Sequence, residues 1–103
     1  MPILGDIREL ALPGTRVIDL ARFPDERGIF TEVLREDWKD FLEEDSIVQA
    51  NLSITYPGIV RAWHRHLRGQ VDYFLVIRGT LKVCAYDDEE SSPTKGHLIA
   101  VSY

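Results

Sequence analysis

The sequence predicts an all-β fold, a β-sandwich or barrel with one short helix, and three observations support this prediction. Apolar residues occur in short runs that are rich in β-branched and aromatic side chains. Glycine, proline, aspartate and serine separate these runs at the spacing of strand connections. The chain has 103 residues, of which 45% are hydrophobic, and this is enough for one modest core. We therefore expect a single domain over residues 1–103.

Seven segments are expected to be strands. The first covers 15–21, and a turn at 24–28 leads into the second, 29–35. Trp38 and Phe41 lie three apart among acidic residues, which predicts one or two turns of helix near 36–43. Three strands follow at 47–54, 59–66 and 70–78, and Gly79 is expected to turn the chain tightly into 80–86. A polar loop at 87–96 precedes the last strand, 97–102.

Seven strands are fewer than a closed sandwich or barrel usually contains. We expect either that a partner chain completes the sheet or that this sequence is part of a longer protein. Cys84 is the single cysteine and cannot form an internal disulfide. Stability must therefore come from packing and from any subunit partner.

The charge of the chain argues against nonspecific binding to nucleic acid. Lysine and arginine number 12 against 17 acidic residues, for a net charge of −5. Residues 57–82 are the exception, because Asp72 is their single acid beside five basic residues, Arg61, Arg65, Arg68, Arg78 and Lys82. This local excess suits a small anionic ligand. A solvated strand face is the alternative interpretation.

The chain is also expected to be cytoplasmic and to make no contact with a membrane. No window approaches the roughly 18 consecutive apolar residues that a membrane span needs. Residues 1–6 lack the charged and then apolar layout of a secretory signal.

Two histidines form the most informative cluster of the sequence. His64 and His66 are two apart in the expected strand 59–66, so they share a face, as do Gln70 and Asp72 in the next strand. A hairpin that joins the two strands would set the amide and the carboxylate opposite the imidazoles. The sequence therefore predicts a pocket, with a chance surface pair of histidines as the alternative.

The spacing around this pair resembles the first motif of the cupin superfamily. Gly58, His64, His66, Asp72 and Gly79 occupy the motif positions, although aspartate stands where glutamate is usual and the gap after the second histidine is longer. The resemblance implies a cupin-type β-sandwich or jelly-roll barrel, here incomplete because the second motif is absent. In metal-binding cupins, the two histidines and the acidic residue bind a divalent ion. This is the alternative to a site without metal.

A closer resemblance spans almost the whole sequence. Five blocks follow one another as in the dTDP-4-dehydrorhamnose 3,5-epimerases: 25–32 (DERGIFTE), 49–53 (QANLS), 57–64 (PGIVRAWH), Gln70 with Gly79, and 92–96 (SPTKG). The resemblance implies an isomerase that acts on a dTDP-4-keto-6-deoxyhexose for deoxysugar and polysaccharide synthesis. It also implies a homodimer that needs no redox cofactor.

The first block implies a nucleotide site. In that family the matching arginine lies near phosphate and the phenylalanine against the thymine, often reaching across a strand-exchanged dimer. The corresponding residues here are Arg27, Phe30 and Glu32. A guanidinium is a bidentate partner for phosphate, and an aromatic face stacks on a base. The alternative is that Phe30 belongs to the core and Glu32 is a solvated strand residue.

The middle blocks imply contacts to the rest of the substrate. Gln49 and Asn51 share a strand face and, with Gln70, would offer amide groups. Arg61 would hold the diphosphate. Strict alternation places Arg61 on the face opposite His64, so a bulge or the twist of the strand must redirect it.

His64 matches the general base of that family, which removes a proton next to the ketone. A neutral imidazole, which titrates at about 6.5, suits this task. The enolate that forms needs a cation or a hydrogen-bond donor at the C4 oxygen. The family uses a lysine two residues after the glutamine, and here Asp72 holds that position. The family's tyrosine acid, and the aspartate that pairs with the base, lie beyond residue 103.

Three roles for Asp72 stay open. It orients His64 or His66, it ligates a metal that supplies the missing positive charge, or it marks a changed reaction. The closely spaced histidines also resemble those of the nucleotide-sugar 3,4-ketoisomerases. A binding subunit without catalytic activity is the remaining alternative.

Overall fold

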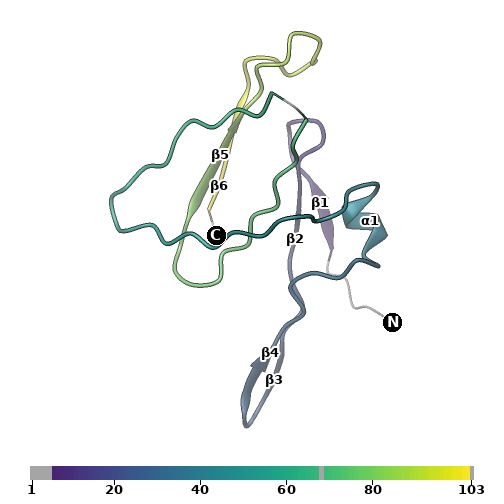
Figure 1. The fold of residues 1–103 in the computed structure, drawn as a ribbon, viewed down its shortest axis with the longest axis vertical. Coiled ribbons are helices and arrows are strands. Elements are labelled where there is room, and N and C mark those ends of the chain that lie inside the picture. The colour runs from purple at the N-terminus through teal and green to yellow at the C-terminus, as the bar shows by residue number, and fades with distance from the viewer. Residues whose placement is uncertain (1–5, 68, 103) are drawn as a thin grey trace.

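A computed structural model describes residues 6–67 and 69–102, so Arg68 of the basic stretch and the residues at both ends lie outside the described part. Within these ranges the chain forms three antiparallel strand pairs and one helix (Figure 1). The pairs are β1 (Ile7–Glu9) with β2 (Arg16–Ile18), β3 (Phe23–Asp25) with β4 (Gly28–Phe30), and β5 (Lys82–Tyr86) with β6 (Leu98–Ser102). The helix α1 covers Lys39–Leu42, inside the predicted span of 36–43.

The small core lies where α1 meets the hairpin of β1 and β2. Leu12, Trp38 and Leu42 are the buried hydrophobic side chains among the described residues. Arg16 on β2 donates from Nε to the carbonyl of Phe41 at 2.9 Å and pairs with Glu43 at 2.9 Å. These contacts dock the helix on the hairpin.

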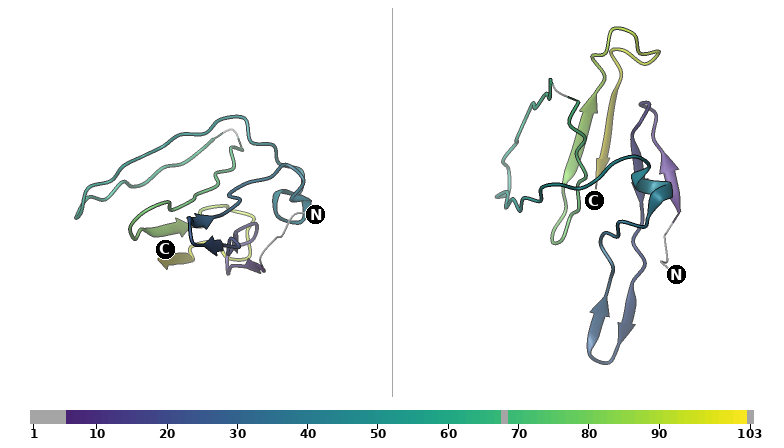
Figure 2. Two further views of the ribbon diagram at one scale, coloured as in Figure 1. Left: turned by 90° about the horizontal axis from the view of Figure 1, so that it is seen from below. Right: turned by 45° about the vertical axis from the view of Figure 1, so that its right-hand side comes forward.

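The hairpin of β3 and β4 extends away from the rest of the chain (Figures 1 and 2). Its turn is tight because the backbone N–H of Arg27 donates to the carboxylate of Asp25 at 2.8 Å. Gly28 follows with a φ of 139°, a conformation that side chains disfavour.

The pair of β5 and β6 is the longest, with five residues in register from Lys82 opposite Ser102. The polar loop that joins them is ordered. The backbone N–H of Asp87 donates to the carbonyl of His97 at 3.0 Å, and the Asp87 carboxylate accepts hydrogen bonds from Ser92 and Thr94. These two hydroxyl groups hold the pKa of Asp87 below its usual value.

Residues 46–67 and 69–78, which we call the open arm, belong to no described strand pair. In Figure 2 (left) much of the open arm passes as a separate layer over β5 and β6. The prediction of paired strands at 47–54, 59–66 and 70–78 is therefore wrong for this structure. An apolar pattern does not by itself make a strand pair, because a ladder also needs a neighbouring backbone about 4.8 Å away.

Other predictions are corrected in detail. The described residues form three two-stranded sheets and no closed sandwich or barrel, so the mostly β character is confirmed and the jelly roll is not. β1 was not predicted, and β3 extends into the expected turn at 24–28. The strands expected at 15–21, 80–86 and 97–102 are present in shortened form, and the strand expected at 29–35 is replaced by β4, which begins at Gly28 inside the expected turn. No helix in the described residues is long and apolar enough to cross a membrane.

Candidate functional site

The structure brings three of the predicted site residues into contact on the open arm. His66 Nε2 lies 2.9 Å from Asp72 Oδ2, and the Gln70 side-chain amide donates to Asp72 Oδ1 at 2.8 Å. Gln70 Nε2 is also 3.4 Å from the same ring nitrogen of His66. These side chains meet although two to six positions separate them in the sequence. We call these three residues the His66–Asp72 cluster.

The electrostatics of the cluster favour an ionised Asp72. The hydrogen bond from Gln70 lowers the pKa of this carboxyl group most, and the hydrogen bond and charge of His66 and the charge of His64 act in the same direction. A carboxylate only accepts hydrogen bonds, so His66 carries its proton on Nε2. The opposite ring nitrogen, Nδ1, is then directed away from the carboxylate and is available to another partner.

The predicted pocket is not enclosed in this structure. His64, His66, Gln70 and Asp72 are all exposed to solvent. The open arm lacks a covering layer within the described residues, so the cluster lies on a surface. His64 is nevertheless near enough for its charge to reach Asp72.

The alternative metal site is not assembled either. In the described part of the chain, no three histidine, cysteine, aspartate or glutamate side chains converge to hold a metal ion. Of the proposed set His64, His66 and Asp72, the structure joins the second and third. These three side chains therefore do not form a three-ligand group within the described residues.

An anchor that the sequence analysis missed holds the segment that carries Asp72. The Tyr73 hydroxyl donates to Asp45 Oδ2 at 2.7 Å, and its ring meets Phe41 of α1 edge-on with 5.5 Å between the centroids. Partial burial is the main reason why the pKa of Tyr73 is raised. Alternation in extended backbone sends residue 73 to the side opposite residue 72. This alternation was the signal in the sequence that could have identified Tyr73 as a residue that packs against another element.

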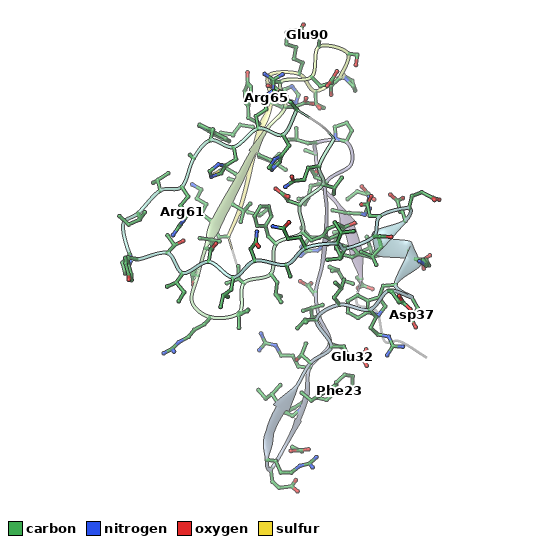
Figure 3. All side chains as sticks on the ribbon, in the orientation of Figure 1. Phe23, Glu32, Asp37, Arg61, Arg65 and Glu90 are labelled. Atoms are coloured by element: carbon green, nitrogen blue, oxygen red, sulfur yellow. The ribbon has the colours of Figure 1, made fainter. Side chains whose placement is uncertain are left out.

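Arg61, Gln49 and Asn51 lie elsewhere on the open arm. Arg61 donates to the Thr55 hydroxyl and to the carbonyl of Ile54, each at 2.9 Å, across the turn at 57–58. Gln49 donates to Asn51 Oδ1 at 3.3 Å, so the two amides share a face. Figure 3 shows Arg61 and Arg65 on the open arm, far from Phe23 and Glu32.

The residues of the first block lie on and beside the protruding hairpin and do not reach the cluster. Arg27 pairs with Asp25 at 2.7 Å, which lowers the pKa of that aspartate. Phe30 is 63% exposed beside Phe23, so the alternative of a core phenylalanine is wrong. Glu32 pairs with Arg35 at 3.3 Å.

Three relatives resemble this chain. A probable low-salt glycan biosynthesis epimerase, Agl13 of Haloferax volcanii, is 49% identical over 82 residues, which cover 80% of this chain and 51% of that protein. The spore coat polysaccharide biosynthesis protein SpsL of Bacillus subtilis is 38% identical over 82% of this chain and 54% of its own length. A dTDP-4-dehydrorhamnose 3,5-epimerase of Neisseria gonorrhoeae is 33% identical over 88% of this chain and 28% of its own length.

The chain therefore spans about half the length of the first two relatives and less of the third. No solved structure matches it significantly. The sequence model of the dTDP-4-dehydrorhamnose 3,5-epimerases matches residues 9–102, nearly the whole chain. The ordered motif blocks and this match lead to one conclusion: the chain belongs to the dTDP-4-dehydrorhamnose 3,5-epimerase family.

Proposed function

We propose that this chain carries the substrate-binding and proton-abstracting part of a sugar-nucleotide epimerase. The proposed substrate is a dTDP-4-keto-6-deoxyhexose, used for deoxysugar or polysaccharide precursors. Family membership and the names of the relatives support this class of reaction. The observation that carries the proposal is the contact between His66 and Asp72, within electrostatic reach of His64.

His64 is the proposed general base. A hydrogen on the carbon next to a ketone is acidic because the electron pair left behind spreads onto the ketone oxygen as an enolate. The neutral imidazole takes this proton from C3 and, in a second round, from C5. Inversion then requires that His64 pass its proton to solvent and that an acid on the opposite face, which the family resemblance places beyond residue 103 as a tyrosine, return a proton to the carbon. General acid–base catalysis of this kind contributes about 10²–10⁴-fold in rate.

His66 is the proposed partner of the enolate oxygen, in place of the lysine that the family resemblance implies at position 72. The Nε2–H of His66 donates a hydrogen bond to Asp72, and the carboxylate stabilises a positive charge on the imidazole. The Nδ1–H of that imidazolium then donates to the C4 oxygen. The pair thus restores the cation that the aspartate appeared to remove from the site.

The remaining residues bind the nucleotide in this proposal. Arg61 leaves Thr55 to hold the diphosphate, and Gln49, Asn51 and Gln70 offer amide contacts. Arg27 and Phe30 act in the partner's site of a cytoplasmic homodimer, because their exposed hairpin projects from its own chain (Figure 1). Each step moves a proton and no electrons, so the proposal needs no redox cofactor.

The test is turnover in deuterium oxide. The chain is incubated with a dTDP-4-keto-6-deoxyhexose, and NMR follows the C3 and C5 positions. We expect deuterium at both carbons, and His64→Ala should lower the rate of incorporation by about 10²–10⁴-fold. Absence of label at both carbons would contradict the proposal. A carbonyl that moves to C3 would instead identify a ketoisomerase, and binding without exchange would identify an inactive subunit.

A chelator distinguishes the metal-dependent alternative from the proposal in which His66 supplies the positive charge. If His66 supplies the positive charge, EDTA leaves the exchange rate unchanged. Loss of exchange with EDTA, restored by a divalent ion, would replace His66 with a metal in the mechanism.

A further inference from the structure

Arg16 on β2 is a mostly buried cation that has no place in the proposed nucleotide site. Its side chain is 13% exposed, whereas the side chain of Arg8 on the same hairpin is 54% exposed. A guanidinium that loses most of its water needs partners for its N–H groups. The residues that Arg16 contacts therefore indicate what it holds in place.

The contacts of Arg16 converge on the helix α1 and its C-terminal end, which lie against the hairpin of β1 and β2 (Figures 1 and 2). Its Nε–H donates to the carbonyl of Phe41 at 2.9 Å, and a second guanidinium nitrogen pairs with Glu43 at 2.9 Å. The guanidinium carbon also lies 6.0 Å from the centroid of the Phe41 ring. A planar, forked cation can make these contacts together, whereas a lysine offers a single point of charge.

Glu43 ends α1 in a backbone conformation that costs free energy. Its φ is 54°, in the left-handed region that residues other than glycine rarely adopt. Such a conformation persists where the surrounding contacts fix it. The ion pair with Arg16 is a contact of this kind, so Arg16 stabilises the path by which the chain leaves the helix towards Asp45.

Tyr73 connects this end of the helix to the candidate site. Its hydroxyl donates to Asp45 at 2.7 Å, and its ring packs edge-on against Phe41, the residue that Arg16 holds from the other hairpin. The charge of Arg16 also reaches the Tyr73 hydroxyl. Asp72 directly precedes Tyr73, so a displacement of the tyrosine moves the carboxylate of the site.

We propose that Arg16 is a positioning residue for the His66–Asp72 cluster. It acts through the end of α1 and through Tyr73 rather than on the substrate. The hairpin of β1 and β2 thus determines the geometry of a site whose residues come much later in the chain. The catalytic part of this inference rests on the proposed function, whereas the structural part does not.

NMR of the Gln70 side-chain amide tests the structural part without substrate. This amide donates to Asp72 at 2.8 Å, so its proton shifts report the geometry of the cluster. In Arg16→Met, which keeps an unbranched stem and removes the guanidinium, we expect these shifts to move towards those of a free amide. Arg16→Lys returns the charge without the fork and should restore part of the difference. Unchanged Gln70 signals in Arg16→Met would overturn the proposal. If Arg16→Met does not fold, unchanged signals in Arg16→Lys would do the same.

Two further variants test the route of the effect. Arg8→Met is the matched control, because Arg8 lies on the same hairpin and pairs with Asp19 at 3.4 Å in solvent, and it should leave the Gln70 signals unchanged. Tyr73→Ala removes the connection, so adding Arg16→Met to it should move these signals no further. Additive changes in the double variant, or an equal change in Arg8→Met, would overturn the route through Tyr73.

Deuterium exchange at C3 tests the catalytic part. We expect Arg16→Met to lower kcat by about tenfold or more and to leave KM within about twofold, because the cluster acts on the enolate that forms after binding. Arg16→Lys should recover part of the lost kcat. A raised KM with unchanged kcat would overturn the positioning role in catalysis. Altered Gln70 signals with both constants unchanged would instead refute the proposed role of the cluster in the reaction, and they would leave the structural role of Arg16 intact.

Discussion

At the scale of single residues, the proposed function assigns to His66, six residues before Asp72, the positive charge that the family resemblance implies at position 72. Asp72 contacts His66 at 2.9 Å and is held on its other oxygen by Gln70. A charge-assisted hydrogen bond of this kind is about twice as strong as a neutral one and fixes the orientation of the ring. The pair therefore acts as one unit, and its members should not be substituted independently without loss.

A charge-restoring double variant tests this unit. His66→Ala should lower exchange at C3 by roughly 10²-fold or more, in the range measured for the loss of one oxyanion donor. His66→Ala with Asp72→Lys returns a cation to the site and should recover at least part of that loss. Asp88→Asn is the control, because Asp88 pairs with Arg65 outside the cluster. An unchanged rate in His66→Ala would refute the role of His66.

The ionisation of Asp72 gives a pH prediction with a definite sign. Its pKa in the folded chain is lowered from the ordinary 3.8, first by Gln70 and then by His66. The contact therefore contributes stability above about pH 3.8, and this contribution is lost as the pH falls through the lower folded value. The side-chain amide signals of Gln70 should report a midpoint below 3.8, and Gln70→Ala should raise the midpoint seen at Asp72. A midpoint at or above 3.8 would contradict the assigned geometry.

The sequence could predict this cluster only in part. Alternation along strands suggested that residues 64, 66, 70 and 72 face one another, and the structure joins three of them. It could not predict that Arg61 bonds to Thr55 and Ile54, because that contact depends on how the turn at 57–58 closes. Nor could it predict the exposure of the site, which depends on what covers the open arm.

At the scale of elements, the short helix α1 positions the open arm. Asp45 just beyond the helix and Phe41 within it hold Tyr73, next to Asp72 in the chain. The helix has four residues and little stability of its own, so its packing on β2 must hold it in place. Tyr73 thus links the segment of the His66–Asp72 cluster to the helix next to the small core.

Removal of the Tyr73 hydroxyl should loosen this connection. Tyr73→Phe loses a hydrogen bond worth about 0.5–1.5 kcal/mol. Amide order parameters in 70–78 should fall, while Tyr86→Phe on β5 should leave them unchanged. Equal order parameters in both variants would show that packing of the residue 73 ring on Phe41 is enough to hold this segment without the hydrogen bond.

Truncation of the core under α1 should destabilise the whole chain. Leu42 is 2% exposed, and Leu42→Ala should cost about 2–5 kcal/mol of unfolding free energy in urea. Leu52→Ala, at a 78% exposed position, should change it by less than about 0.5 kcal/mol. Similar losses at both positions would place the core elsewhere.

The sequence predicted the positions of several elements better than their pairing. The helix and the strand regions at 82–86 and 98–102 were found because local patterns suffice for a helical turn and for a hairpin. The prediction of three paired central strands was wrong because apolar periodicity favours an extended segment but carries no information about which segment lies beside it. Of the short pair of β1 and β2, the sequence predicted β2 but not β1, because a strand of three residues gives little pattern.

At the scale of the whole molecule, the chain is less compact than a typical domain of the same length. Its Cα radius of gyration is 15.5 Å, whereas a compact domain of about 100 residues has roughly 13 Å. The protruding hairpin and the open arm account for this shape (Figure 2). The hairpin is also the region that the proposed homodimer places in the partner's site.

Small-angle scattering should detect this openness. The isolated chain at low concentration should give a radius of gyration clearly above about 13 Å. A value near 13 Å would show that the open arm folds back on β5 and β6. The double variant Val60→Asp with Phe74→Asp should keep the larger value, because it does not favour collapse.

The burial of Trp38 and the exposure of Trp63 give the molecule two spectroscopic reporters of opposite character. Trp38 is 2% exposed beside α1, whereas Trp63 is 65% exposed on the open arm. Emission from the first should be blue-shifted and shielded from acrylamide, and emission from the second should be red-shifted and readily quenched. A single fluorescence titration can therefore distinguish melting of the core from covering of the arm.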